Sequence, residues 1–560
     1  MLNTDNQNEH RFDIFILMKK LIIVLVIGIG NICYAQKEES DNRFAGNKNK
    51  PARQEWLRDL GFGMFIHFNV DAQLGITISH SLVGASDDYV KRYYNELPKT
   101  FDPYKFNPDE IAKLAKLAGM KYVVFTTKHH SGFCFWDTKT SNFKITNTPY
   151  KKDLLKLYVQ AIRKAGLAVG FYYSPEDFSF LYKHHILIKR GDMQFDKKTT
   201  AAYDSLVRQQ TTELFTHYGK IDVLFIDGEP KEPCRDVAWK LQPDVVITRG
   251  AVNTPEQTLP GVSLNDFWES NATMGTQWNY KPTNDNIKTG GRLIELLVEA
   301  RAKGGNFLLN VGPHPDGYIP YEQETPLREM AAWHFINHEA IEGVRSWIVC
   351  NEENIWFTAS KDKQTVYAVI TGIPDWPKGE RKEFVLGSVK ATPQTKISVL
   401  GQNDEVTEYN NQLDVHSRFE QKEDGLHISV ARAQRVYDNY KWPNPITVKL
   451  EHVEPALDPP IVETGEAVTA NGAVELHGRL VKKGNAGNVK VLFEYRPFAG
   501  FAENLYSKDW LKTDAVTVHD EGNFTVQLAQ AEKGKEYQYR AVVVHPRLTV
   551  RGDVKKVVAK

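Results

Sequence analysis

Short apolar runs recur along residues 60–313, and stretches with helical spacing of apolar residues separate most of them. The runs are FGMFIHF (62–68), KYVVFTT (121–127), LAVGFYYS (167–174), IDVLFID (221–227), DVVITRG (244–250) and NFLLNVGP (306–313). They are continuously apolar instead of alternating with polar residues. This pattern is typical of strands whose two faces are both buried in a parallel sheet.

Amphipathic segments lie between these runs and predict helices. The clearest cover residues 107–120, 153–166, 201–219 and 292–305. A repeated strand–helix order predicts a (β/α) barrel of the TIM type over residues 56–345. A doubly wound parallel sheet is the alternative architecture for the same order of elements.

The pattern changes after residue 345. Segments such as NIWFTASKDKQTVYAVITG alternate apolar and polar residues, and they predict a β-sandwich over residues 346–453. A proline-rich linker (454–463) follows this domain. Residues 464–560 predict a second β-sandwich of immunoglobulin or fibronectin type III character.

The N-terminal segment has the composition of a secretory signal peptide. Basic residues after Met18 precede the apolar run LIIVLVIGIG (21–30), and small residues favour cleavage after Ala35. The apolar run is too short for a membrane-spanning helix. We therefore expect a signal peptide over residues 1–35, with a misassigned start before Met18.

Export places the mature protein in the periplasm or outside the cell. A lipid anchor on Cys33 is the alternative, although Ile32 precedes it where a small residue is wanted. A polar linker (36–55) connects the signal peptide to the first domain.

Charge and cysteine content exclude several classes of protein. The chain has 560 residues, and its 70 Lys and Arg balance 70 Asp and Glu, so nothing global favours nucleic acid or an anionic membrane. After cleavage three cysteines remain, at positions 134, 234 and 350. This odd and widely spaced set predicts neither a disulfide framework nor a zinc site.

Polar residues follow the apolar runs where each predicted strand ends. They are His67, Lys128, His129, His130, Tyr172, Tyr173, Ser174, Asp227 and Arg249. Because the carboxyl ends of barrel strands meet at one face, these side chains predict a functional site there.

Asp227 is the strongest catalytic candidate, because a buried run leads directly to its carboxylate and Gly228 permits a sharp turn beside it. Glu269 follows Trp268, and an apolar wall raises a carboxyl pKa, which suits a general acid. Two such carboxyl groups are the equipment of a retaining glycosidase. A helix-capping Asp and an exposed loop Glu are the ordinary alternatives.

The histidines at the strand ends allow three interpretations. His67, His129, His130 and Asp227 could bind zinc, but the spacing matches no common zinc motif. They could be structural residues with satisfied hydrogen bonds. Neutral imidazoles that exchange hydrogen bonds with sugar hydroxyls are the third interpretation.

Several of these stretches resemble the α-L-fucosidases of glycoside hydrolase family 29. They are FGMFIHF, the long stretch FNPDEIAKLAKLAGMKYVVFTTKHHSGFCFWDTKTSNFKITNT, VGFYYSPEDF, DVLFIDGE, FWES and NFLLNVGPHPDG, in the family's order over about 60–340. The resemblance implies a barrel followed by a β-sandwich, with no metal and no cofactor. It also implies exo-hydrolysis of a terminal α-L-fucosyl residue of a glycan with retention.

The resemblance implies roles for individual residues. Asp227 matches the nucleophile and Glu269 matches the usual acid/base, with Glu176, Glu229 and Glu295 as alternatives for the second role. The expected sugar-binding residues are His67, His129, His130, Tyr173 and Trp136, together with Arg249 at a strand end. Aromatic walls for the apolar sugar face are expected from Phe62, Phe225, Trp268 and Trp278.

Other activities remain open at this point. An α-L-galactosidase would use the same mechanism, and a polar group at the methyl pocket would favour it. A secreted carbohydrate-binding protein on an inactive barrel, or a metal-dependent hydrolase, would keep the fold and lack this chemistry.

Overall fold

The structure is a computed structural model that describes residues 46–189, 194–373, 376–405, 412–433, 441–470, 473–500, 505, 509–528 and 531–559. The expected signal peptide and the Cys33 anchor lie outside these residues. The described residues from 48 onward belong to one compact unit, which carries all of the strands described below. No helix among the described residues is long and apolar enough to cross a membrane.

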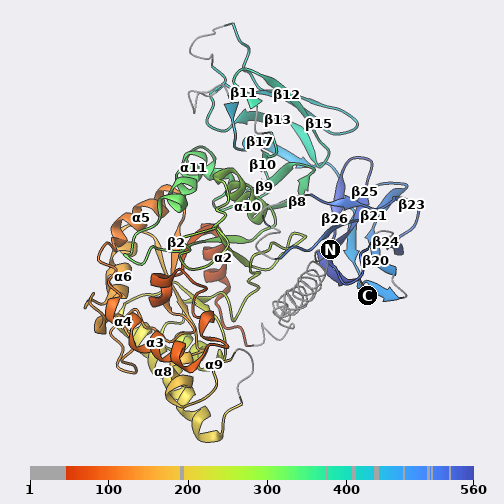
Figure 1. The fold of residues 1–560 in the computed structure, drawn as a ribbon. Coiled ribbons are helices and arrows are strands. Elements are labelled where there is room, and N and C mark those ends of the chain that lie inside the picture. Colours follow the sequence, from red (N-terminus) through yellow and green to blue (C-terminus); the bar gives the residue numbers. More distant parts are fainter. Residues whose placement is uncertain are drawn as a thin grey trace, which may run out of the picture. The chain divides into compact units, whose positions relative to one another are not determined.

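A seven-stranded parallel sheet forms the first domain (Figure 1). Its strands are β1 (Phe62–Ile66), β2 (Tyr122–Lys128), β3 (Ala168–Tyr173), β4 (Val223–Ile226), β5 (Val246–Ile247), β6 (Glu269–Thr273) and β7 (Asn306–Val311). Their order is β5-β4-β3-β2-β1-β7-β6. The prediction of a (β/α) barrel is confirmed in the form of a half-barrel, because isolated bridges alone connect the chain after β5 with β6: Asn253 to Trp268 and Glu256 to Asn271.

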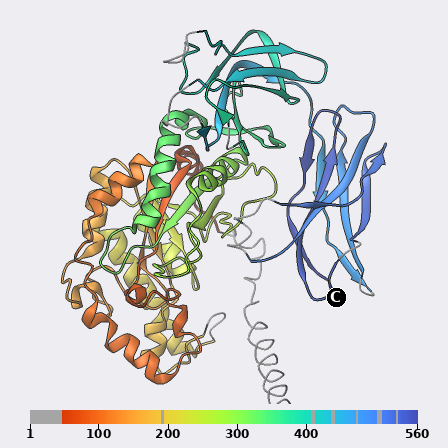
Figure 2. The same cartoon turned by 45° about the horizontal axis from the view of Figure 1, so that its top comes forward.

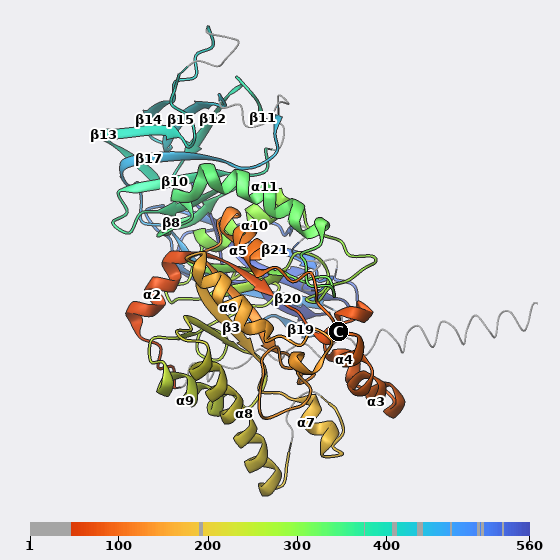
Figure 3. The ribbon, with the colours of Figure 1, turned by 90° about the vertical axis from the view of Figure 1, so that its left-hand side faces the viewer.

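Helices precede, connect and follow the strands of this sheet. They are α2 (Pro51–Leu60), α3 (Asp87–Asn95), α4 (Leu97–Thr100), α5 (Pro108–Leu117), α6 (Leu154–Lys164), α7 (Phe178–Lys183), α8 (Lys197–His217), α9 (Glu232–Leu241), α10 (Gly290–Ala302) and α11 (Tyr321–Asn337). Asn107 caps α5 by accepting a hydrogen bond from the Glu110 amide, and Pro108 occupies the first turn. Figure 3 shows α5 and α6 side by side over the sheet.

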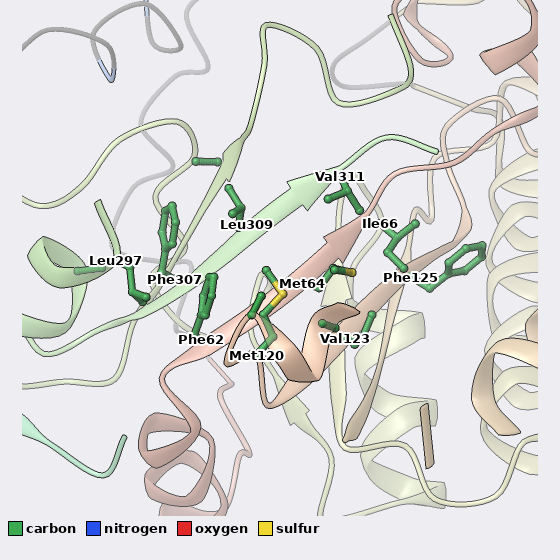
Figure 4. Packing of buried hydrophobic residues seen from close by; sticks show 14 of the residues in the cluster. Phe62, Met64, Ile66, Met120, Val123, Phe125, Leu297, Phe307, Leu309 and Val311 are labelled. Atoms are coloured by element: carbon green, nitrogen blue, oxygen red, sulfur yellow. The ribbon is translucent and has the colours of Figure 1, made fainter. Parts of the chain in front are cut away.

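Alternation along each strand separates two apolar clusters. Phe62, Met64 and Ile66 of β1 belong to the outer cluster with Phe307 and Leu309 of β7, as Figure 4 shows. The inner cluster contains the side chains between them along each strand, such as Phe65 of β1 and Leu308 of β7. Burial of each large apolar side chain contributes about 2 kcal/mol, so this alternation fixes which face of a strand points into the barrel.

Antiparallel sheets follow the half-barrel. A five-stranded sheet contains β8 (Arg345–Glu352), β9 (Ile355–Ala359), β10 (Thr365–Ile370), β13 (Val389–Val399) and β17 (Ile446–Pro455). A second sheet contains β12 (Arg381–Leu386), β14 (Arg418–Gln421) and β15 (Leu426–Ala431), and β11 (Trp376–Pro377) pairs with β16 (Lys441–Trp442). The expectation of a β domain after the barrel is thereby confirmed.

The last domain has its own apolar core and two antiparallel sheets (blue in Figure 2). One contains β18 (Ile461–Thr464), β19 (Val468–Ala470), β20 (Ala473–Lys482) and β24 (Gly522–Leu528). The other contains β21 (Val489–Pro497), β22 (Leu511–Lys512), β23 (Val516–Val518), β25 (Glu536–Val544), β26 (Thr549–Arg551) and β27 (Lys555–Val558). This is the second β domain expected from the sequence.

Candidate active site

Asp227 lies at the carboxyl edge of the half-barrel, immediately after β4. Its amide donates to the carbonyl of Tyr173 at 3.1 Å, which continues the strand pairing up to this residue. Gly228 then turns the chain with φ of 101°, and a side chain there would collide with Glu176. The Asp227 side chain is 22% exposed and is therefore accessible at the mouth of the barrel.

Two donors hold the two oxygens of Asp227 separately. The Tyr172 hydroxyl donates to Oδ2 at 2.9 Å, and Nη1 of Arg249 donates to Oδ1 at 3.1 Å. Burial and the Asp227 charge raise the pKa of Tyr172 well above its ordinary value, so this hydroxyl stays protonated. The carboxylate is thus fixed in orientation beside a permanent positive charge.

Arg249 connects Asp227 to a second carboxylate. Its Nη2 donates to Oε2 of Glu256 at 2.7 Å, and the Glu256 side chain is 20% exposed. Glu256 lies on the segment that follows β5, where an isolated bridge pairs it with Asn271 of β6. Neighbouring nitrogens of one guanidinium therefore bring two accessible carboxylates to one place.

The adjacent histidines are braced by two different serines. Nδ1 of His129 lies 2.8 Å from the Ser79 hydroxyl, and Nδ1 of His130 lies 2.6 Å from the Ser174 hydroxyl. Nε2 of His130 lies 3.6 Å from Oδ2 of Asp227. Both rings are almost completely buried, so each presents one edge to the site and is held by the other edge.

His67 forms the floor beside these rings. Its Nδ1 lies 2.7 Å from Oδ1 of Asn310, whose Nδ2 in turn donates to the Trp278 carbonyl. An amide oxygen only accepts, so Nδ1 of His67 carries the proton and Nε2 is an acceptor. Burial lowers the pKa of His67 to about 4, which keeps this imidazole neutral.

Aromatic rings line the other side of the mouth. The Phe225 ring stacks on Tyr172, with centroids 5.7 Å apart. Trp278 lies 4.7 Å from the His67 ring and 6.1 Å from Phe65. The predicted residues His67, His129, His130, Phe225, Asp227, Arg249 and Trp278 are therefore brought together at one edge.

The same residues could approach a metal ion. One donor atom from each of His129, His130 and Asp227 lies within 4.8 Å of the others. However, Arg249 donates to Asp227 at 3.1 Å, and its positive charge opposes a cation at this carboxylate. The donor set fits a hydrogen-bonding role better than a metal site.

The structure does not bring Glu269 to Asp227. Glu269 is the first residue of β6 and pairs with Asn306, the first residue of β7. It therefore lies at the amino-terminal ends of the strands, opposite the carboxyl ends where Asp227 lies. Its Oε2 accepts from the hydroxyl of Tyr122, the first residue of β2, at 2.5 Å. A seven-residue strand such as β2 spans about 20 Å, far more than the 5–5.5 Å between the carboxyls of a retaining pair.

Glu269 nevertheless has the raised pKa that was expected of it. Burial raises the pKa to about 7, because the carboxyl lies inside the barrel away from water. The carboxyl group with the raised pKa therefore lies at the amino-terminal ends of the strands, away from Asp227. Residues 269–273 (ESNAT) lack an apolar run, so the sequence did not predict that Glu269 begins a strand instead of following one.

Tyr173, Trp136 and Trp268 point away from the mouth. Tyr173 donates to Gln210 of α8 at 2.8 Å, and Trp136 donates to Glu213 of the same helix at 2.8 Å. Trp268 donates to the Lys303 carbonyl at the other edge of the sheet. Because side chains alternate along β3, Tyr172 points inward and occupies the position expected of Tyr173.

The alternative carboxylates are placed differently. Glu229 is exposed and pairs with Lys231, whereas Glu295 pairs with Arg292 on α10, in the helical layer. Glu176 is buried, with Oε2 3.3 Å from Nδ1 of His130. Of these three, only Glu176 contacts the site.

Four site residues were not predicted from the sequence: Tyr172 in its present role, Glu256, Asn310 and His80. His80 lies on the loop after β1, with its ring 5.2 Å from His130 and 5.9 Å from His129. Strand alternation could have selected Tyr172. Asn310 lies on β7, where the same alternation places it on the inner face with Leu308. Glu256 and His80 depend on how loops fold, which local patterns do not specify.

Comparisons with known proteins agree on one family. A family model described as alpha-L-fucosidase matches residues 31–339. Tissue alpha-L-fucosidase of Mus musculus is 30% identical over 396 residues, covering 62% of this chain and 83% of the mouse protein. Plasma alpha-L-fucosidase of Rattus norvegicus is 29% identical over 338 residues, covering 55% and 71%.

Solved structures show the same likeness. Alpha-L-fucosidase isoenzyme 1 from Paenibacillus thiaminolyticus has a TM-score of 0.57 at 26% identity, covering 72% of this chain and 99% of that one. A Bacteroides thetaiotaomicron alpha-L-fucosidase, trapped as a covalent intermediate, has a TM-score of 0.57 at 22% identity, covering 73% and 97%.

Proposed function

The chain belongs to the α-L-fucosidase family of glycoside hydrolases, and we propose that it removes terminal α-L-fucosyl residues from glycans with retention of anomeric configuration. The observation that carries this proposal is the Asp227–Arg249–Glu256 bridge at the barrel mouth. A retaining glycosidase needs one carboxylate as nucleophile and a second as acid and base a few ångströms away.

Asp227 is the nucleophile in this mechanism. One of its oxygens attacks the anomeric carbon while the bond to the leaving oxygen breaks, which gives a covalent glycosyl-enzyme. Tyr172 and Arg249 hold the carboxylate for in-line attack through one hydrogen bond to each of its oxygens. The trapped covalent intermediate of the Bacteroides thetaiotaomicron relative supports a covalent step.

Glu256 replaces Glu269 as the acid and base. It gives its proton to the leaving oxygen in the first step and takes a proton from the attacking water in the second. Its accessibility and its link through Arg249 support this assignment. Glu269 is enclosed at the opposite edge and reaches neither a sugar nor water at the mouth.

Imidazoles and aromatic rings together form the pocket for the terminal sugar. Nε2 of His67 accepts from a sugar hydroxyl, because its Nδ1 proton is engaged by Asn310. Phe225 and Trp278 offer apolar faces to the ring and to the C6 methyl group. An apolar wall favours a methyl group over the hydroxymethyl group of L-galactose.

Aryl α-L-fucosides test the proposal directly. The first product that NMR detects from the wild-type enzyme should be α-L-fucose, before mutarotation produces the β-anomer. The enzyme should turn over the matching α-L-galactoside more slowly. Asp227→Asn should abolish turnover while thermal unfolding stays cooperative. Undiminished turnover of Asp227→Asn, or inverted product, would contradict the mechanism.

Export is a further part of this proposal. It rests on the basic and apolar pattern of residues 18–35. N-terminal sequencing of the natural protein should start after Ala35. An unprocessed chain would contradict export, and a lipid-modified Cys33 would contradict cleavage after Ala35 in favour of the anchored form.

A further inference from the structure

A row of rings extends from the candidate active site along the same edge of the half-barrel. Its rings are those of Tyr280, His314, Tyr318 and Tyr104, and the Lys105 ammonium lies over the last two; these five residues are here called the aromatic shelf. Centroids lie 4.8 Å apart for the first pair of rings and 4.6 Å apart for the second. The Lys105 ammonium then lies 5.2 Å from the Tyr318 ring and 5.1 Å from the Tyr104 ring.

The inner end of the shelf begins at the wall of the sugar pocket. Tyr280 follows two residues after Trp278, whose ring contacts His67. Gly312 lies so close to this segment that a Cβ atom there would be 2.7 Å from the Tyr280 amide nitrogen. The backbone after β7 therefore holds Tyr280 beside the pocket.

The outer end lies on the same edge because of the chain topology. Tyr104 lies in the connection between α4 and α5, which leads to β2, and Tyr318 lies between β7 and α11. In a barrel, both segments belong to the edge where strands end and helices begin. A backbone hydrogen bond from Lys105 to Asp316, 2.8 Å long, joins the two loops.

Exposure increases outward along the shelf. Tyr280 is half-buried, Tyr318 is 38% exposed and Tyr104 is 65% exposed. The Lys105 ammonium also pairs with Asp316 at 2.8 Å, so one cation contacts both outer rings and this carboxylate. Tyrosine side chains have two torsions and therefore lose little conformational entropy on binding.

Exposed aromatic faces with polar groups at their edges suit one kind of ligand. Pyranose rings offer apolar C–H faces for stacking and hydroxyls around the rim for hydrogen bonds. Asp316 supplies a carboxylate acceptor and Lys105 supplies an ammonium donor beside the rings. The balanced charge of this pair favours a neutral oligosaccharide over an anionic one.

We propose that the aromatic shelf binds the neutral oligosaccharide to which the terminal fucosyl residue is attached. This inference rests on the proposed function, because the glycan extends along the shelf only if its terminal fucosyl residue occupies the pocket. It implies that the enzyme selects long fucosylated glycans by contacts outside the pocket for the terminal sugar. Binding energy from this remote part then adds to kcat/KM for long substrates.

Two shelf variants and one matched control test the proposal. Tyr104→Ala and Tyr318→Ala remove a ring from the shelf, whereas Phe335→Ala removes an exposed ring (86%) near the far end of α11. Substrates are an aryl α-L-fucoside and oligosaccharides that carry the same fucosyl linkage on one to four further sugars. Each shelf variant should lower kcat/KM on the longest substrate about fivefold and leave the aryl fucoside unchanged.

Calorimetric binding of the unfucosylated tetrasaccharide gives a readout independent of hydrolysis. Wild type and Phe335→Ala should bind it equally, and the shelf variants should bind it about fivefold more weakly. Equal binding by all four proteins, or equal losses on aryl and long substrates, would overturn the shelf. If wild type hydrolyses no α-L-fucoside but shows ring-dependent binding, the proposed function fails and the shelf stands.

Discussion

The Ser79 hydroxyl lies 2.8 Å from Nδ1 of His129 and sets which edge of this imidazole faces the site. Ser79 Oγ accepts from the Ser131 amide at 2.9 Å and from Asn69 Nδ2 at 3.4 Å. Its own proton therefore goes to Nδ1 of His129, which leaves Nε2 of the imidazole protonated as a donor. Ser79 adopts a strained backbone conformation with φ of 55°, and its amide donates to Asp71 at 2.7 Å. This hydrogen bond holds the Ser79 hydroxyl in position beside His129.

Ser79→Ala and Ser79→Gly separate the hydroxyl from the backbone strain. Both remove the bond to His129, but glycine also relieves the positive φ. We expect both variants to lower kcat on an aryl α-L-fucoside about tenfold, with Ser79→Gly the more stable of the two in thermal unfolding. Wild-type kcat in Ser79→Gly would show that the backbone turn, not the hydroxyl, matters.

Glu256→Gln and Glu269→Gln distinguish the two acid/base assignments. Glu256→Gln should lose activity on substrates with poor leaving groups by about 100-fold or more. On a dinitrophenyl fucoside it should still form the covalent intermediate, which intact-protein mass spectrometry detects as a fucosyl adduct. Glu269→Gln is the matched control and should keep near-wild-type turnover; the reverse order of losses would restore Glu269 to the mechanism.

Glu269 should instead control stability as a function of pH. Its folded pKa of about 7 exceeds its ordinary 4.5, so the folded protein binds this proton more tightly than the unfolded chain. The resulting stability is fully present below pH 4.5 and is lost as the pH rises through 7, a change of about 3 kcal/mol. Denaturant unfolding of Glu269→Gln should lack this loss, and parallel pH profiles for both proteins would contradict the assignment.

Neighbouring tyrosines of β3 offer a matched pair of substitutions. Tyr172→Phe removes the hydrogen bond to the Asp227 carboxylate, so kcat should fall about 10- to 100-fold with little change in stability. Tyr173→Phe removes the bond to Gln210 and should lower the free energy of unfolding by about 1 kcal/mol while kcat is retained. Equal kinetic losses in the two variants would mean that both rings act through packing.

Metal removal tests the grouping of His129, His130 and Asp227. Because Arg249 neutralises Asp227 and Tyr172 occupies its other oxygen, activity should be insensitive to prolonged dialysis against a chelator. Loss of activity that added zinc or calcium restores would assign an ion to this group.

The sequence predicted those site residues that end an apolar strand, because burial on both faces determines where such a strand stops. Asp227, His67 and the two adjacent histidines are of this kind. Tyr173 was expected from the family resemblance, whereas alternation along β3 places Tyr172 on the inner face of the strand. Glu256 was missed because its approach to Arg249 depends on how the chain crosses from β5 to β6, and no local pattern encodes that path.

Isolated bridges alone join β6 to the segment that follows β5, so Asp227 and Glu256 are restrained by the sheet to different degrees. Asp227 ends a strand that is paired over its length with β3, whereas Glu256 lies on a connection that continuous pairing does not restrain. Insertions or deletions in this connection can re-aim Glu256, the proposed proton donor, while the strand that positions Asp227 stays paired. In evolution, and in engineering for new leaving groups, we therefore expect the acid/base to be the part of the proposed pair that can be exchanged.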